Sequence, residues 1–260
     1  MVFRRLFSTA SAEPRGPEGW RAYVIGDVHG RLDLLDRLLY EIERDHEARG
    51  PAKGLLVLLG DLIDRGPQSA VVIERVRSAP LPGFRVVALA GNHEEVLLAI
   101  LNGNGERLAS WLTFGGAEAL ASYGLDPDEI GRLAPDQAVE RIRAAVPETH
   151  RRFLESLADS FRFGDYLFVH AGIRPGVPIE AQTLQDLRWI REPFLSDSRD
   201  HGVTVVHGHT MTERVVAHGS RIGVDTGAYA SGRLSALGIE GAERWVLDTI
   251  DGRAASIAHV

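Results

Sequence analysis

The 260-residue sequence contains no cysteine at all. Disulfide bonds, thiolate metal sites and a cysteine nucleophile are therefore excluded for this chain. Any metal site must be built from nitrogen and oxygen ligands, a ligand set that suits Mn, Fe or Zn.

The sequence also lacks a long apolar run and an excess of positive charge. No stretch approaches the roughly 20 apolar residues that are needed to span a bilayer. A net charge of −7 argues against general binding to nucleic acids or anionic membranes, although it leaves room for a local basic pocket for a phosphorylated substrate. We therefore expect a cytoplasmic protein with neither a nucleic-acid nor a membrane partner.

Internal repeats and low-complexity linkers are absent after residue 20. A chain of this length forms one large domain or two small ones, and we expect one domain over residues 21–260. Residues 1–20 include a run rich in Ser, Ala, Pro and Gly, which predicts a flexible N-terminal arm. The alternative for this segment is a short amphipathic docking or targeting element.

The first third of the chain alternates between strand and helix patterns three times. Apolar runs over residues 22–26, 55–59 and 84–89 predict strands, the second of them buried on both faces. Leucines at helical spacing over residues 32–42 predict a helix, and Pro67 suits the first position of the next one. A polar motif follows each strand, at the carboxyl end where open α/β sheets bind ligands.

The rest of the chain divides into a helical and a β-rich part. We expect a helical insertion over about residues 95–160 that covers part of one edge. Short strands are predicted after it, at residues 166–169, 203–206, 215–217, 221–224, 234–239 and 245–248. These strands predict a second β-rich half that packs face to face on the first sheet, which makes the chain an α/β protein.

Six short motifs contain the polar side chains that could carry chemistry. In chain order they are Gly26-Asp27-Val28-His29-Gly30, Gly60-Asp61-Leu62-Ile63-Asp64-Arg65-Gly66, Gly91-Asn92-His93-Glu94, His170-Ala171-Gly172, Gly208-His209-Thr210 and Asp225-Thr226-Gly227. Together they offer carboxylates, imidazoles and an amide, which is the ligand set for two neighbouring metal ions.

The first two motifs suggest metal binding by carboxylates. Asp27 and His29 stand two apart at a strand end, so in an extended chain their side chains point the same way, although this pattern alone is also typical of a turn. Asp61 directly follows a buried strand and is suited to bridge two metals. We expect Asp64 and Arg65 one helical turn further on, with a helix-surface charge as the alternative for Arg65.

The later motifs add neutral ligands. Asn92 offers an amide oxygen, and His93 beside it faces differently and stays free for proton transfer; a helix cap with a surface histidine is the alternative. His170 and His209 follow apolar strands, where either one alone would more often be a core histidine. Their occurrence together with the other motifs at strand ends favours ligation.

The content and order of these motifs resemble the phosphoprotein phosphatase family of binuclear metallophosphoesterases, and its bacterial and phage lambda-like members in particular. The resemblance runs from about Tyr23 to Leu237. It implies a calcineurin-like metallophosphoesterase fold, in which a central β-sandwich is flanked by helices and carries a helical insertion.

The resemblance also implies a role for each motif residue. Two divalent ions, Mn in preference to Fe or Zn, would be held by Asp27, His29, Asp61, Asn92, His170 and His209, with Asp61 bridging. His93, oriented by Asp64, would be the general acid. Arg65, Arg191 and Asn92 would bind the substrate phosphate.

Three further residues complete the interpretation. Arg174 is a weaker candidate for a substrate contact, with a solvated loop residue as the alternative. His207 is expected to support a strand end rather than to bind metal. Met211 stands where broader metallophosphoesterases often carry a histidine, which leaves three protein ligands and open positions on the first metal.

The leading functional prediction is a serine/threonine protein phosphatase that uses a metal-bridging hydroxide. The alternative is a hydrolase of dinucleoside polyphosphates, such as diadenosine tetraphosphate, or of other small phosphoesters. A non-catalytic scaffold is a remote third hypothesis, because every expected position is filled.

Overall fold

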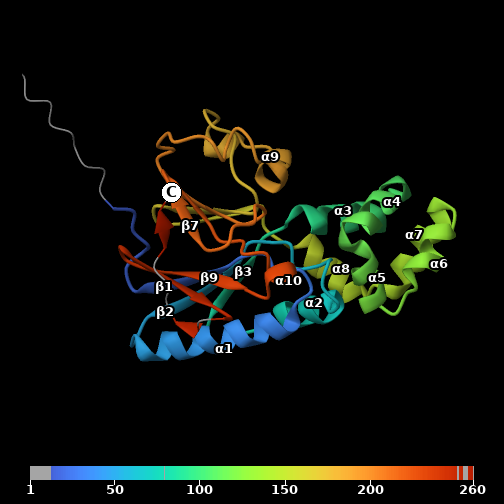
Figure 1. The fold of residues 1–260 in the computed structure, drawn as a ribbon, viewed down its shortest axis with the longest axis horizontal. Coiled ribbons are helices and arrows are strands. Elements are labelled where there is room, and N and C mark those ends of the chain that lie inside the picture. Colours follow the sequence, from blue (N-terminus) through green and yellow to red (C-terminus); the bar gives the residue numbers. More distant parts are fainter. Residues whose placement is uncertain (1–12, 79, 251, 254–256, 260) are drawn as a thin grey trace, which may run out of the picture.

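Two six-stranded sheets form the centre of the computed structural model, which describes residues 13–78, 80–250, 252–253 and 257–259 (Figure 1). The first sheet contains, in spatial order, β11 (Gly252–Arg253), β10 (Glu243–Asp248), β9 (Ser235–Glu240), β1 (Trp20–Ile25), β2 (Lys53–Leu58) and β3 (Arg85–Ala88). The second contains β12 (Ala258–His259), β7 (Val216–His218), β8 (Arg221–Gly223), β6 (Thr204–His207), β5 (Tyr166–Val169) and β4 (Ser160–Phe163).

Alternating side chains of the central strands supply two separate cores. On β1, Ala22 and Val24 pack between the sheets, whereas Tyr23 and Ile25 pack against the helices. The same alternation places Phe168 of β5 between the sheets. Because successive residues of a strand point to opposite faces, a strand covered on both faces is apolar throughout, which explains the continuous apolar runs.

Helices cover the outer faces of the sandwich (Figure 1). Helices α1 (Leu32–Ala48) and α2 (Ser69–Arg77) pack on the first sheet. The short helix α9 (Leu184–Trp189) and its loops pack on the second, where Leu187 and Phe194 join Leu167 and Val205 in a third core. No helix in the described part of the chain is both long and apolar enough to cross a membrane.

The expected helical insertion is present and gathers at one side of the sandwich (Figure 1). Its elements are α3 (Asn92–Leu101), η1 (Gly105–Arg107), α4 (Leu108–Trp111), η2 (Leu112–Gly116), α5 (Ala117–Ser122), α6 (Pro127–Arg132), α7 (Pro135–Ala145) and α8 (Glu148–Glu155). Ala158 returns the chain to the sandwich, since its carbonyl accepts a hydrogen bond from Ala90 N–H at 2.9 Å. The apolar side chains of the insertion, such as Leu97 and Leu120, belong to the same core as those of α1 and α2.

Two predicted details of the fold are wrong. The hairpin of β9 and β10 joins the first sheet, where β9 pairs antiparallel with β1, instead of belonging to the second β-rich half. Alternation in the sequence shows that a segment is a strand but not which edge it pairs with. Helix α2 begins at Ser69 and not at Pro67, because Gln68 has a non-helical backbone with φ −126° and ψ 33°. Its N–H donates to the carbonyl of Gly30 at 3.0 Å.

The predicted N-terminal arm falls largely on residues 1–12, which lie outside the described residues. Its described part is hydrogen-bonded to the domain. Tyr166 Oη donates to the carbonyl of Pro14 at 3.0 Å, and Gly16 N–H donates to the carbonyl of Gly241 at 2.8 Å.

Candidate metal centre

Loops from both sheets converge at one edge of the sandwich. Strands β1, β2 and β3 run parallel, as do β5, β6 and β8, so their carboxyl ends meet there. The loops that follow β1, β2, β5 and β6 contain Asp27 and His29, Asp61, His170, and His209, respectively. After β3, Asn92 and His93 are the first two residues of α3. The structure therefore brings together side chains that lie up to 182 residues apart in the chain.

The backbone of these loops is left-handed at five residues other than glycine. In the described residues, positive φ at non-glycine positions occurs at His29 (45°), Asp61 (47°), Asp64 (71°), Arg65 (65°) and His209 (61°). Such conformations cost of order 1–3 kcal/mol each and persist where the surroundings enforce them, most often at functional sites.

This geometry corrects two expectations. His29 does not continue an extended chain from Asp27, and Asp64 and Arg65 do not lie on a helical turn after Asp61. Backbone hydrogen bonds between the loops impose the sharper turns. The N–H groups of Val28 and His29 both donate to the carbonyl of Asp61, at 3.1 and 2.8 Å.

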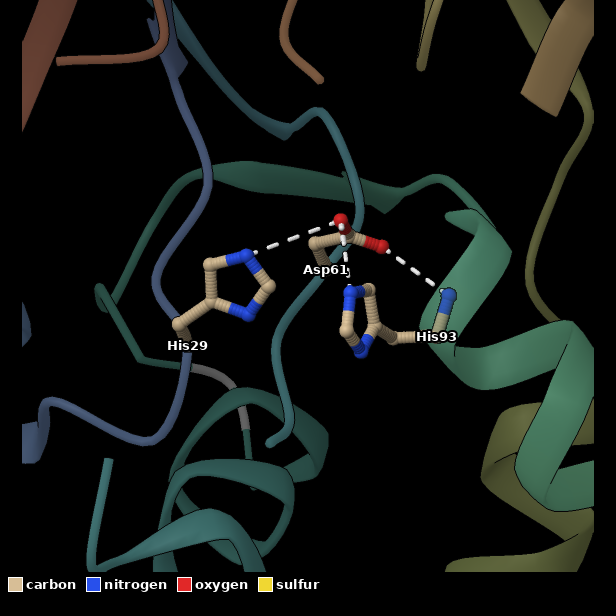
Figure 2. Close-up of side chains that lie close together, drawn as sticks. All are labelled: His29, Asp61 and His93. Carbon is tan, nitrogen blue, oxygen red and sulfur yellow. Dashed lines mark hydrogen bonds and ion pairs between the residues drawn. The ribbon is translucent and has the colours of Figure 1, made fainter. Parts of the chain in front are cut away.

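The Asp61 carboxylate lies at the centre of the site (Figure 2). Its Oδ2 is 3.6 Å from His29 Nε2 and 3.9 Å from His93 Nε2. The same oxygen is 3.5 Å from His170 Nε2. Two groups offer donor atoms that all lie within 4.8 Å of one another: His29, Asp61 and His93, and Asp61, His170 and His209. Asp61 belongs to both groups and could be shared by two ions.

Asp27 lies on the wall of the same cavity but outside both three-residue groups. Its two carboxylate oxygens accept hydrogen bonds from the backbone N–H of His209 at 3.0 and 3.2 Å. The first group thus contains His93 where the family resemblance implies Asp27. Asp27 is nevertheless buried, and it lies close enough to Asp61 for the charge of that carboxylate to contribute to the rise in its pKa.

Hydrogen bonds of the histidines leave lone pairs directed at Asp61. His29 Nδ1 lies 2.8 Å from the carbonyl of Ile63, and His170 Nδ1 lies 2.9 Å from the carbonyl of Leu59. A carbonyl only accepts, so each Nδ1 carries the proton and each Nε2 presents a lone pair. Burial lowers the pKa of His29 to about 3 and also lowers the pKa of His170, which keeps both rings neutral. This is the state in which imidazole binds metal.

Unsatisfied acceptors at the site fit a cation. The neutral His170 ring turns its Nε2 lone pair toward Asn92 Oδ1, another acceptor, at 3.0 Å. His209 Nε2 is buried and has no hydrogen-bond partner among the described residues. Buried polar atoms are normally paired, and a divalent ion would satisfy all three atoms at once.

Three buried carboxylates also favour bound cations at the site. Asp27, Asp61 and Asp225 are all at most 2% exposed. Burial, followed by the charges of Asp225 and Asp61, raises the pKa of Asp27 well above its usual value. Burial also raises the pKa of Asp225 to about 6. Carboxylates crowded in this way are costly unless cations accompany them.

His93 is paired with a second carboxylate. Its Nδ1 lies 2.6 Å from Asp64 Oδ2, and this contact directs Nε2 into the cavity. Burial lowers the pKa of His93, but the charge of Asp61 and the hydrogen bond to Asp64 outweigh it and raise this pKa to about 9. Cations bound at Asp61 would offset part of that rise, because they cancel its charge.

A cavity of about 720 Å³ opens above these groups. Arginines and apolar side chains surround it, namely Arg65, Arg107, Arg191, Val96, Trp111, Phe114, Trp189, Met211 and Tyr229. The Arg65 guanidinium carbon lies 4.6 Å from the centre of the Tyr229 ring, and Arg65 Nη2 lies 3.4 Å from His93 Nε2. The structure thus brings Arg65 and Arg191 to the same cavity.

Arg174 and His207 lie outside the cavity and outside both ligand groups. Arg174 does not line the cavity and forms an ion pair with Asp186, in which Nε lies 3.0 Å from Oδ2. His207 belongs to neither ligand group; its Nδ1 lies 3.0 Å from the carbonyl oxygen of Gly208, and its ring packs against Phe194.

Sequence reasoning assigned no role to Glu94, yet this residue organises the site. Its carboxylate is completely buried. Oε1 accepts from the N–H groups of Leu62 and Ile63 at 2.8 and 3.3 Å, and Oε2 accepts from those of Asp61 and Gly91 at 2.9 and 2.8 Å. A glutamate three residues after a helix N-cap is a known capping signal, and it could have identified Glu94. No local sequence signal predicts that Arg107, Trp111 and Tyr229 line the cavity.

The chain is similar to known proteins over most of its length. The family model for calcineurin-like phosphoesterases matches residues 21–231. The chain is 28% identical to serine/threonine-protein phosphatase 1 of Salmonella typhimurium, over 86% of this chain and 94% of that protein. It is 30% identical to the asymmetrical bis(5'-nucleosyl)-tetraphosphatase PrpE of Halalkalibacterium halodurans, over 82% of this chain and 88% of that protein.

A solved structure shares the fold. The crystal structure of the cold-active protein-tyrosine phosphatase of a psychrophilic Shewanella species superimposes with a TM-score of 0.61. The match covers 95% of this chain and 85% of that chain at 21% identity. At this identity the likeness concerns the fold alone.

Replacement of Glu94 by glutamine should destabilise the protein. Glutamine keeps one acceptor oxygen, so two buried N–H groups lose their partner, at about 1–3 kcal/mol each. We expect Glu94→Gln to lower the free energy of unfolding by about 2–6 kcal/mol, measured by urea denaturation in chelator. The exposed Glu118 of α5 offers a matched control, since Glu118→Gln should change it by less than about 0.5 kcal/mol. Equal effects of the two substitutions would contradict the role of Glu94.

Proposed function

This chain belongs to the calcineurin-like phosphoesterase family, and we propose that it is a metal-dependent phosphomonoesterase that acts on phosphoserine and phosphothreonine in proteins. The observation that carries the proposal is the shared position of Asp61 between two ligand groups, at the base of a cavity with Arg65 and Arg191 on its wall. Metal ligands beside cationic side chains suit a reaction in which negative charge develops on phosphoryl oxygens. The relative from Salmonella typhimurium that is named a serine/threonine-protein phosphatase supports the choice of substrate.

Two divalent ions are part of this proposal, with manganese as the first choice. The residues that would hold them are Asp27, His29 and Asp61 for one ion, and Asp61, Asn92, His170 and His209 for the other. We assign Asp27 rather than His93 to the first ion, because a buried carboxylate beside Asp61 needs a cation to stay charged. When bound, such ions lower the pKa of a coordinated water and neutralise phosphoryl charge.

The remaining residues bind the substrate and move a proton. Arg65 and Arg191 would hold the phosphoryl oxygens from the cavity wall, and Asn92 would help to orient them. His93 would give the proton on Nε2 to the departing oxygen. Asp64 would hold the ring by its bond to Nδ1, as an orienting carboxylate does for a catalytic histidine.

Hydrolysis of dinucleoside polyphosphates is the second candidate. The relative named an asymmetrical bis(5'-nucleosyl)-tetraphosphatase aligns with this chain over a similar length. A third arginine, Arg107, and the rings of Trp111, Phe114 and Trp189 also line the cavity, and they could contact further phosphates and a base. The non-catalytic scaffold is set aside, because the family consists of phosphoesterases and each implied site position is filled. The cytoplasmic location stays a prediction.

The two substrate classes are separated by turnover on metal-reconstituted protein. We expect kcat/KM for a phosphoserine peptide to exceed that for diadenosine tetraphosphate by at least about tenfold, a difference of about 1.4 kcal/mol in transition-state binding. Release of phosphate from the peptide and of nucleotides from the polyphosphate are measured under identical conditions. The opposite order would establish the second candidate.

Substitution of His93 should distinguish good from poor leaving groups. General acid assistance is typically worth 10²–10⁴-fold, and it matters most for an alkoxide such as the serine side chain. We expect His93→Asn to lower kcat on the phosphoserine peptide by about 10²–10⁴-fold and to affect 4-nitrophenyl phosphate far less.

His150 provides the matched control, since it is also buried and lies 3.2 Å from a carboxylate, Glu74, but does not line the cavity. His150→Asn should leave the ratio of the two activities unchanged. Equal losses on both substrates in His93→Asn would argue against His93 as the acid.

Removal of the bridging charge should lower the metal content of the site. We expect Asp61→Asn to abolish turnover and to reduce the bound metal from two ions per chain to one or none, since a neutral amide is a much weaker bridge. Metal content is measured by elemental analysis after dialysis against chelator and reconstitution. Asp128→Asn, on the exposed surface of α6, should retain both ions. Full activity of Asp61→Asn after the same dialysis would refute the binuclear arrangement.

A further inference from the structure

The indole of Trp111 reaches from the helical insertion to the carboxylate that holds His93. Trp111 Nε1 donates to Asp64 Oδ2 at 2.7 Å, and the same oxygen lies 2.6 Å from His93 Nδ1. Trp111 is 3% exposed and Asp64 is completely buried. Asp64 Oδ1 has no partner among the described residues, so both hydrogen bonds of this carboxylate meet on one oxygen.

The segment that follows Trp111 in the chain also binds Arg65, the residue after Asp64. Arg65 N–H donates to the carbonyl of Gly115 at 3.0 Å. Gly115 has a φ of 111°, and a side chain there would lie 2.7 Å from Arg65 N. Gly116 packs on the face of the Trp111 indole, where a Cβ would approach to 2.3 Å. The segment from Trp111 to Gly116 therefore contacts Asp64 and Arg65 in succession.

These contacts fall on two residues whose backbone is left-handed and strained. Asp64 and Arg65 have φ values of 71° and 65°. A carboxylate group rotates about its terminal torsion with only a broad preference, so burial alone does not fix the plane in which its two equivalent oxygens lie. A second donor on the oxygen that faces His93 does fix this plane, because rotation would break two hydrogen bonds to a charged group.

We propose that Trp111 is a positioning residue for proton transfer by His93, an inference that rests on the function proposed above. Its indole N–H locks Asp64 with Oδ2 toward His93 Nδ1, and the locked pair directs His93 Nε2 at the leaving oxygen. The helical insertion thereby contributes to the chemical step as well as to the wall of the cavity. Trp111 acts on His93 through Asp64, so it positions the acid and is not itself the acid.

Trp111→Phe tests the role, since it keeps an aromatic ring against Gly116 and removes the N–H donor. We expect kcat on the phosphoserine peptide to fall about 10- to 100-fold, as for loss of a hydrogen bond to a charged group. On 4-nitrophenyl phosphate, which needs little acid assistance, kcat should change by less than about threefold. KM should change little for either substrate.

Trp245 offers a matched control within the same chain. Its indole Nε1 also donates to a buried carboxylate, Asp45 Oδ2 at 3.0 Å, but it lies on β10 and does not line the cavity. Trp245→Phe should affect both substrates equally. In a His93→Asn background, Trp111→Phe should cause no further loss of kcat on the peptide, because both substitutions impair the same proton transfer. Additive losses, or equal losses on both substrates in Trp111→Phe, would overturn the proposal.

The contact itself is tested without altering Trp111. Labelling with ¹⁵N-tryptophan gives indole signals from the four tryptophans of the sequence. Asp64→Asn should shift one of these signals and speed its hydrogen exchange, and Asp45→Asn should shift a different one. Absence of a shift in Asp64→Asn overturns the positioning role even if Trp111→Phe does not fold. A wild-type protein that hydrolyses neither substrate would overturn the proposed function and this role together, whereas an active enzyme with unselective losses overturns the role alone.

Discussion

The site depends on one buried carboxylate, that of Glu94, which holds two loops to each other. Its oxygens accept from the backbone N–H groups of Gly91, Asp61, Leu62 and Ile63. These donors lie in a region without water access, where an unpaired N–H is costly. Glu94 therefore joins the loop after β2 to the start of α3, and it sets the distance between Asp61 and the side chains of α3.

The strained backbone of the site follows from that attachment. Asp61 adopts a left-handed conformation while its N–H is bound by Glu94 and its carbonyl accepts from Val28 and His29. Every backbone group of Asp61 is thus engaged, so the loop cannot relax without loss of several buried hydrogen bonds. Strain of this kind survives only where many contacts oppose its release, and here it points the Asp61 carboxylate into the space between the histidines.

Burial shifts the pKa values of several acidic and basic side chains of the site in opposite directions. It raises the pKa of Asp27 and lowers those of His29 and His209, so each group is pushed toward its neutral form. Neutral imidazoles are ready to bind metal, whereas the carboxylates need cations to remain charged. The same burial therefore keeps the histidines in the form that binds metal and makes the carboxylates costly without a bound cation. Asp61 and His93 depart from this pattern. Despite burial, the charge of Asp61 and the hydrogen bond to Asp64 raise the pKa of His93, and the surrounding histidines lower the pKa of Asp61.

The types of ligand side chain, and their position at the ends of strands, can be predicted from the amino-acid sequence alone. Apolar runs predict strands, and a polar motif directly after a parallel strand falls at the ligand-binding edge whatever the rest of the fold. Asp27, Asp61 and His170 are predicted at strand ends in this way, and helical patterns predict the insertion. The pairing of β9 with β1, the left-handed backbone of Asp64 and the hydrogen bond from Trp111 to Asp64 are seen only in the folded chain. Those features depend on hydrogen bonds between residues far apart in the chain, and local spacing carries no information about which distant donor meets which acceptor.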